Sequence, residues 1–327
     1  MKRLLLICLL PALALAALAE PVSLRFAAQE EGTAAYSYAY ALRMAMLDSL
    51  PDGTEIALTE DSPGGVGAPM FLSSGQSDII MSNSVPAKES CDTGLLGQPR
   101  TENIAALAGG LGHDFINVMF TKRFVDETGI DTVEALVEQQ YPVRLITKKT
   151  GTLGELSAER VFEAMGVTFD DIVAWGGEVK QTSGLEIVEG LQDDRYDMTI
   201  DHIGEGQSNT TALCLTHDMV DVQMGDDLLG RLKEMGYGDI VVAPNTWNGQ
   251  TEAIRTVGSQ QCVLVRTDMD DDLAYALTRA ICEERDLMAV MVPALKSFDP
   301  SVAGDVAVTG VPLHPGAARY YEENRYR

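Results

Sequence analysis

The feature that most constrains the fold is a repeated order of strand, glycine-bearing loop and helix. Its first copy occupies residues 24–50, with a strand at 24–28, a loop at 29–33 and an apolar run from Ala34 onward. One helical stripe in that run predicts a helix that packs on a sheet through Tyr36, Tyr40, Met44 and Leu47. Gly32 and Thr33 then lie at the helix start, where unpaired N–H groups and the helix macrodipole favour a polar or anionic ligand.

The same order recurs along the chain. A strand at 55–59 leads into a loop that contains Ser62, Gly64 and Gly65 and then into a helix ending at Gly75, and a strand at 78–82 ends at Asn83 and Ser84. In the second half a strand at 143–147 leads through Thr150, Gly151 and Thr152 into a helix at 153–165, and a strand at 196–200 ends near Gly204. Further strands are predicted at 117–121 and 254–266, and further helices at 130–139, 185–191 and 270–285. Residues at the carboxyl ends of parallel strands meet in one crevice, so the pattern predicts an α/β fold with a ligand cleft.

The first 19 residues are typical of an export signal. Lys2 and Arg3 precede an apolar run over 4–18, and Ala17-Leu18-Ala19 has the small-x-small form of a cleavage site. The run is about 15 residues long, too short for a helix that crosses a bilayer core of about 30 Å. We expect cleavage after Ala19, a periplasmic location and no membrane insertion of the mature chain.

Composition narrows the possible functions. The chain has 49 acidic and 24 basic residues and a net charge of −25, which disfavours nucleic acid and anionic membranes as partners. The cysteines beyond the signal show no Cys-x-x-Cys spacing, so neither a metal site nor a redox centre is expected. Buried thiols and one disulfide both remain open for Cys91, Cys214, Cys262 and Cys282.

An enzyme is the rival class, but its motifs are missing. The sequence has no Gly-x-Ser-x-Gly elbow, His-Glu-x-x-His pair or P-loop. We expect no catalytic residues and no cofactor, with a secreted hydrolase as the less favoured alternative. His314 is interpreted as a turn or packing residue. The pair Asp201-His202 is a candidate ligand contact at a strand end. Lys148 and Lys149 are interpreted as solvated side chains.

The end of the chain resembles a known family. The segment Pro312–Ala317, followed by Tyr320, Tyr321 and Glu322, resembles the C-terminal signature of the TAXI family of solute-binding proteins. Other segments of the chain are also similar to that family. They are the loops with Gly32-Thr33 and Gly64-Gly65, the segment 74–78, and the segment 165–167 together with 170–172. The resemblance implies a periplasmic-binding-protein type II fold, in which two α/β lobes are joined by crossing strands around a central ligand cleft.

The resemblance also implies lobe boundaries, a site and partners. Crossing points near Asn117 and Thr256 give a first lobe of 20–116 with 257–327 and a second lobe of 117–256. The protein is expected to be a monomer whose two lobes close about a hinge on the ligand. The expected ligand is an amino acid such as glutamate, or a di- or oxo-acid. The protein would deliver this ligand to the membrane permease of a tripartite ATP-independent periplasmic (TRAP) transporter. The alternative partner is a membrane kinase that senses the loaded protein. The expected cleft residues are Gly32, Thr33, Ser62, Gly64, Gly65, Asn83, Ser84, Thr150, Gly151, Thr152, Gly204 and Trp247.

The first loop departs from the family. It reads Gln29-Glu30-Glu31 where glycine and threonine are usual. A carboxylate there can cap the helix, point into solvent or line the cleft. If Glu30 or Glu31 lines the cleft, the preferred ligand carries an amine as well as a carboxylate.

Overall fold

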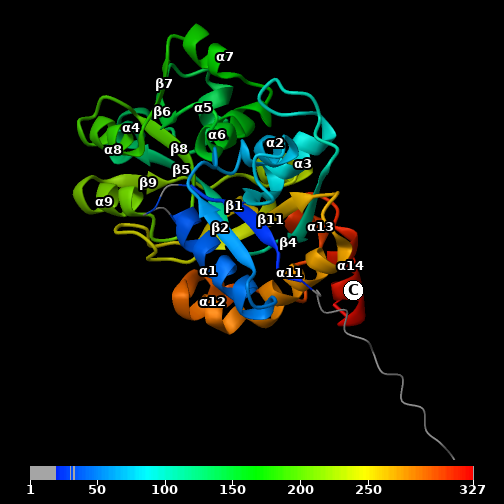
Figure 1. Ribbon diagram of the computed structural model, residues 1–327. Coiled ribbons are helices and arrows are strands. Elements are labelled where there is room, and N and C mark those ends of the chain that lie inside the picture. Colours follow the sequence, from blue (N-terminus) through cyan, green and yellow to red (C-terminus); the bar gives the residue numbers. More distant parts are fainter. Residues whose placement is uncertain (1–19, 30, 32–33, 327) are drawn as a thin grey trace, which may run out of the picture.

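The computed structural model describes residues 20–29, 31 and 34–326 and has a mixed α/β architecture. The predicted signal over 1–19 lies outside the described residues, as do Glu30, Gly32 and Thr33. The strands form one 11-stranded sheet. In Figure 1 the middle of the chain lies in the upper part, and the segments nearer the two ends lie together in the lower part.

The lower part of the sheet is parallel except where the last strand joins it. The parallel order is β2 (Glu55–Thr59), β1 (Ser23–Ala27) and β3 (Ile79–Asn83), and the antiparallel β11 (Ile254–Arg266) follows β3. The strand β4 (Ile104–Ala108) also pairs with β11. With 13 residues, β11 is long enough to continue into the other part of the sheet.

The upper part of the sheet begins at the other crossing strand, β5 (His113–Thr121), which pairs antiparallel with β11. The order then runs through β8 (Met198–Ile203), β6 (Arg144–Lys148) and β7 (Glu178–Thr182). Two short strands complete it, β9 (Met219–Asp221) on β5 and β10 (Gly238–Val242) on β11. The predicted lobe boundaries at 117 and 257 fall within β5 and β11 and stay a prediction.

Helices cover both faces of the lower part, because alternate strand residues point to opposite faces. Phe26 and Val263 face one apolar cluster, whereas Ala27 and Leu264 face another. The first cluster includes side chains of α1 (Ala34–Ser49), α11 (Asp271–Glu283), α12 (Arg285–Met291) and α14 (Pro315–Glu323). The second includes side chains of α2 (Ala68–Ser73) and α3 (Ser84–Asp92). The segment between α12 and α14 forms η1 (Pro293–Ser297) and α13 (Val306–Thr309).

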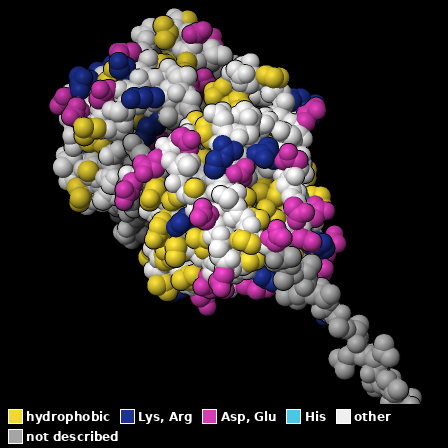
Figure 2. All heavy atoms as spheres, in the orientation of Figure 1, with side chains coloured by type: hydrophobic (Ala, Val, Ile, Leu, Met, Phe, Trp, Pro, Cys, Tyr) yellow, Lys and Arg dark blue, Asp and Glu magenta, His cyan; other side chains and the backbone are white. Residues whose placement is uncertain are grey.

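The upper part repeats this three-layer arrangement. One face packs against α4 (Lys122–Thr128), α5 (Val133–Glu138), α6 (Leu153–Glu163), α7 (Phe169–Ala174) and α10 (Asp226–Glu234). The other face packs against α8 (Gly184–Gln192) and α9 (Ser208–Thr216). Figure 2 shows acidic side chains spread over both parts of the visible face with lysines and arginines between them, as expected of a solvated acidic surface.

The predicted stripe on the first helix is confirmed for Tyr36 and Leu47, which pack against the lower core, and is wrong for Tyr40 and Met44. Tyr40 is 41% exposed, and Met44 is only half-buried. The described helix residues with no exposed surface are Ala39, Ala41, Leu42, Ala45 and Met46. Alanines let the helix approach its neighbours closely, so the buried face is centred on Ala41 and Ala45 and includes Tyr38 but not Tyr40.

Several elements were not expected from the sequence. The helix α3 begins directly at Ser84, where only a strand end was predicted, and the antiparallel strands β9 and β10 were not anticipated. The helix expected over 130–139 is shorter, Val133–Glu138. His314 is confirmed as a turn residue, because its Nδ1 accepts a hydrogen bond from the N–H of Gly316 at the start of α14.

All four cysteines in the described residues are free thiols, three of them buried and Cys91 half-buried. Among the helices that the structure describes, none combines the length and apolar character needed to cross a membrane.

Candidate ligand-binding site

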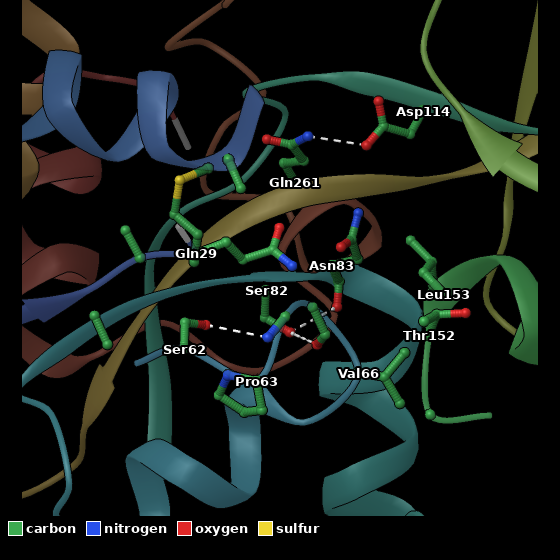
Figure 3. A pocket seen from close by; sticks show the side chains of 17 residues that line it. Gln29, Ser62, Pro63, Val66, Ser82, Asn83, Asp114, Thr152, Leu153 and Gln261 are labelled. Carbon is green, nitrogen blue, oxygen red and sulfur yellow. Dashed lines mark hydrogen bonds between the residues drawn. The ribbon is translucent and has the colours of Figure 1, made fainter. Parts of the chain in front are cut away.

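A cavity of about 260 Å³ lies where the two parts of the sheet meet. Figure 3 shows its lining side chains, which come from loops and strand ends of the lower part and from the segment before α6 in the upper part. Half of the twelve predicted cleft residues line it. These six are Ser62, Gly64, Gly65, Asn83, Gly151 and Thr152.

The loop between β2 and α2 forms one wall of the cavity, and it needs its glycines. Gly64 has a φ of 85°, which favours glycine, and its N–H donates to Ser62 Oγ at 3.3 Å. A Cβ on Gly65 would lie 2.3 Å from Asn83 Oδ1, so only glycine lets this loop approach the end of β3. Ser82 Oγ donates to the carbonyl of Gly65 at 2.7 Å and fixes that approach.

The start of α6 forms the opposite wall. Thr152 caps this helix, because its Oγ1 accepts from the N–H of Glu155 at 3.3 Å. The buried Glu155 carboxylate accepts from the N–H of Gly151 at 3.1 Å and from Gln181 Nε2 at 2.9 Å. This carboxylate offsets part of the positive potential that a helix start presents to a ligand.

The two crossing strands supply a charged group that was not expected. Asp114 extends from β5 and Gln261 from β11, and Gln261 Nε2 donates to Asp114 Oδ2 at 2.9 Å (Figure 3). Burial and the nearby Asp114 charge raise the pKa of Tyr38 to about 12, so the phenol on α1 stays neutral. The cavity therefore has a carboxylate at its hinge side.

The other predicted residues lie elsewhere. Ser84 is buried and its Oγ accepts from the N–H of Gln260 at 3.1 Å, while Thr150 is exposed. Trp247 is buried in an apolar cluster with Phe115. Gly204 does not line the cavity but supports it, because a Cβ there would lie 3.0 Å from Asp114 Oδ1. Gly32 and Thr33 lie outside the described residues.

The pair Asp201 and His202 lies beside the cavity but does not line it. Asp201 Oδ2 is 3.2 Å from Lys148 Nζ, so the prediction of a solvated Lys148 is wrong, although Lys149 is exposed. His202 Nδ1 is 2.8 Å from Ser157 Oγ, and burial lowers the pKa of His202 to about 3, which keeps it neutral. These residues hold β8 against β6 and α6.

Glu31 is exposed and also lies outside the cavity lining, with its N–H donating to Glu60 Oε2 at 3.3 Å. Glu30 is not among the described residues. Within the described ranges, no group of three or more His, Cys, Asp and Glu side chains is arranged to hold a metal ion.

Sequence reasoning missed polar side chains on the crossing strands, on β3 and in the loop after β1. Asp114 and Gln261 carry no local motif, and only their positions on strands that run through both parts of the sheet could have pointed to them. Gln29 and Ser82 also line the cavity, Gln29 two residues after the end of β1 and Ser82 within β3.

Residues 100–324 of the sequence match the NMT1-like family, whereas no curated protein sequence matches the chain. Malate-bound MatC from Rhodopseudomonas palustris has a similar structure, with a TM-score of 0.52, 13% identity, and 94% of this chain and 98% of that chain covered. A binding-protein component of an ABC phosphonate transporter from Pseudomonas aeruginosa is also similar, with a TM-score of 0.50, 11% identity and 84% and 80% covered. These similarities confirm the predicted fold, that of the periplasmic binding proteins, with two α/β lobes around a central cleft.

Proposed function

This chain belongs to the NMT1-like family, and on that premise we propose that it is an extracytoplasmic solute receptor rather than an enzyme. In this proposal the cavity between the lobes captures a small solute that carries a carboxylate, either an amino acid such as glutamate or a di- or oxo-acid. The observation that carries the proposal is the cavity itself, since Gly64 and Gly65 line it from one side and Gly151 and Thr152 from the other. A cavity lined from two lobes suits a solute that is enclosed when the lobes close.

The polar groups of the cavity are suited to binding a solute rather than to catalysing a reaction. Hydroxyl and amide side chains surround it, and the start of α6 offers backbone N–H groups that can hold a carboxylate. His202 on β8 is held neutral, and its Nδ1 lies 2.8 Å from Ser157 Oγ, outside the cavity lining. Among the described residues that line the cavity, the side chains provide hydrogen bonds and include no histidine, lysine or cysteine.

The proposed receptor subfamily, membrane partner and location rest on the first and last segments of the chain. We infer from the closing Pro312–Ala317 segment that the protein is a TAXI-type receptor, that it works as a monomer, and that its membrane partner is a TRAP permease. The leader over 1–19 supports export to the periplasm with cleavage after Ala19. A neighbouring gene for a large multi-span permease would support the transporter, and one for a membrane kinase would support the sensor.

A thermal-shift screen of amino acids and small organic acids tests the proposed function. A ligand at 100 times its dissociation constant adds about 2.7 kcal/mol to the free energy of unfolding, which corresponds to a shift of several degrees for a chain of this size. We expect at least one member of these classes to produce such a shift. Turnover of a substrate, together with no shift from any compound, would replace the receptor by an enzyme.

A further inference from the structure

The helix α6 makes a contact between the two parts of the molecule that lies beyond the cavity. Leu153, Leu156 and Arg160 are spaced by three and four residues, so they lie along one face of this helix. The two leucines pack in one apolar cluster with Val66 and Leu95, which belong to the lower part. The helix whose start forms one cavity wall therefore also touches the other part of the molecule.

This apolar cluster is closed to solvent. Val66 is 1% exposed, Leu156 3% and Leu95 5%. Figure 3 shows Val66 and Leu153 at the same end of the cavity, and both of them line it, whereas Leu95 and Leu156 do not. Separation of the two parts would expose these apolar side chains to water, which costs free energy.

Further along α6 the contact becomes ionic. Arg160 forms an ion pair with Glu89 on α3, and the two side chains are 19% and 24% exposed. Arg160 also pairs with Glu163 of its own helix. Neither Arg160 nor Glu89 lines the ligand cavity. This ion pair therefore joins the upper part to the lower part at a place that a ligand in the cavity does not touch.

Beside the ion pair, a hollow of about 200 Å³ divides the two parts. It lies between α3, α6 and α10, and the charged side chains of Lys88, Asp92, Glu163 and Glu234 are among those that line it. Close packing on this side of the molecule is thus narrow. An interface of limited apolar area permits two domains to move relative to each other, whereas a large apolar interface fixes them. This geometry suits a contact that forms when the lobes close and breaks when they open.

We propose that Glu89, Leu95, Leu156 and Arg160 form an interlobe contact that stabilises the closed arrangement of the lobes and so sets the affinity for the ligand from outside the cavity. A ligand enclosed by two lobes binds the closed arrangement, and its apparent affinity falls with the share of molecules in that arrangement. Loss of the interlobe contact lowers this share and speeds ligand release. The inference rests on the proposed function, because it assigns a means of setting affinity to the same receptor.

Substitutions at the ion pair test the interlobe contact. Affinities and dissociation rates of the mature chain are measured by calorimetry and stopped flow with glutamate, 2-oxoglutarate and the compound that gives the largest thermal shift. Because ion pairs between partly exposed side chains are weak, we expect Glu89→Gln and Arg160→Gln each to weaken binding about three-fold through faster dissociation. The double variant should bind no more weakly than either single variant, since both changes remove the same interaction.

Glu163→Gln is the matched control for the ion pair. It removes the other partner of Arg160, which lies on the same helix and does not cross between the lobes. The affinity of this variant should stay unchanged. An affinity loss in Glu163→Gln as large as that in Glu89→Gln would overturn the inference.

Leu156→Ala tests the apolar side of the interlobe contact. Because truncation of a buried leucine removes much of its packing, we expect binding about ten-fold weaker in this variant. The control is Leu136→Ala in α5, which truncates a fully buried leucine in the core of the upper part. Leu136→Ala should lower the melting temperature and leave the affinity unchanged, which separates closure from a general loss of stability. Without ligand, the Leu156→Ala protein should have a larger radius of gyration than the Leu136→Ala protein.

The outcomes separate this inference from the receptor function. If a solute binds, unchanged affinity in Arg160→Gln and Leu156→Ala, with unchanged radii of the unliganded proteins, would overturn the interlobe contact and leave the receptor function intact. A loss in the double variant equal to the product of the two single losses would also overturn it. If no compound binds, the proposed function fails, and an unchanged radius of the unliganded Leu156→Ala protein would then overturn the interlobe contact as well.

Discussion

At the scale of single residues, the cavity depends most directly on Gly65. A Cβ at this position would lie 2.3 Å from Asn83 Oδ1, so Gly65→Ala must displace Asn83 or the loop after β2. We expect this variant to bind the ligand at least ten-fold more weakly in a calorimetric titration. The matched control is Gly230→Ala in α10, where a Cβ meets no atom within 4 Å.

The control should leave affinity unchanged and raise the free energy of unfolding by about 0.8 kcal/mol, because alanine favours a helix more than glycine does. Equal affinity of the Gly65→Ala and Gly230→Ala proteins would contradict the close approach of this loop to Asn83.

A second residue, Asp221, predicts a pH dependence of stability. Burial raises the pKa of this carboxyl from 3.8 to about 6, and the indole of Trp247 opposes the shift. Between these two pH values the folded protein binds the proton more tightly than the unfolded chain, so this carboxyl makes the free energy of unfolding fall as pH rises through the window. Asp221→Asn should remove that contribution. Urea titrations from pH 4 to 7 should therefore show a gap between variant and wild type that widens with pH, and a constant gap would argue against a buried, protonated Asp221.

The residues of the cavity could be predicted from the sequence where a glycine-bearing loop joins a strand to a helix, and at Asn83, where a polar residue ends a strand. Gly64, Gly65 and Gly151 were found because a glycine between a strand and a helix is a local signal. Asp114 and Gln261 were not found, because their place in the cavity depends on how β5 and β11 cross, which is set by distant parts of the chain. The aromatic Trp247 was expected in the cleft, but the structure places it against Phe115.

At the scale of elements, Asp197 joins β8 to β6 and α4. Burial alone would raise the pKa of Asp197, but hydrogen bonds from Arg144 and Arg123 outweigh it and lower the pKa. Its stabilising contribution is thus present at neutral pH and is lost as pH falls through the lowered pKa. Asp197→Asn leaves both arginines with a neutral partner, and we expect the free energy of unfolding at pH 7 to fall by about 3 kcal/mol in urea titrations.

Asp126→Asn serves as the control for that experiment. Asp126 is paired with Lys122 on the exposed side of α4, with 60% of its side chain exposed. Exposed pairs of this kind contribute about 0.5 kcal/mol or less. Similar losses of unfolding free energy in both variants would mean that Asp197 and its two arginines do not join β8 to β6 and α4.

Most helices and strands could be predicted from the sequence, because the spacing of apolar residues in each segment is typical of its type of element. The strands from β1 to β3 and the helices α1, α6 and α11 were predicted close to their observed bounds. Errors arose where packing decided the outcome. The buried face of α1 is set by alanines that allow close contact, and the short strands β9 and β10 form only because β5 and β11 offer them partners.

At the scale of the whole molecule, two crossing strands connect the parts that enclose the cavity, and this geometry permits hinge closure. Thr256 Oγ1 donates to the carbonyl of Ile116 at 2.6 Å, which ties β11 to β5 near the proposed crossing points. We expect small-angle scattering to give a smaller radius of gyration with saturating ligand than without it. The same radius in both states would show that the lobes do not close.

In the proposed function, one solute contacts both lobes in the cavity between them. Amide hydrogen exchange, measured with and without the best ligand from the thermal screen, reports such contacts segment by segment. We expect the ligand to slow exchange at Gly64–Val66 and at Gly151–Leu153 together, since these segments line opposite walls. Ligand-dependent protection confined to one lobe, or located away from both segments, would contradict it.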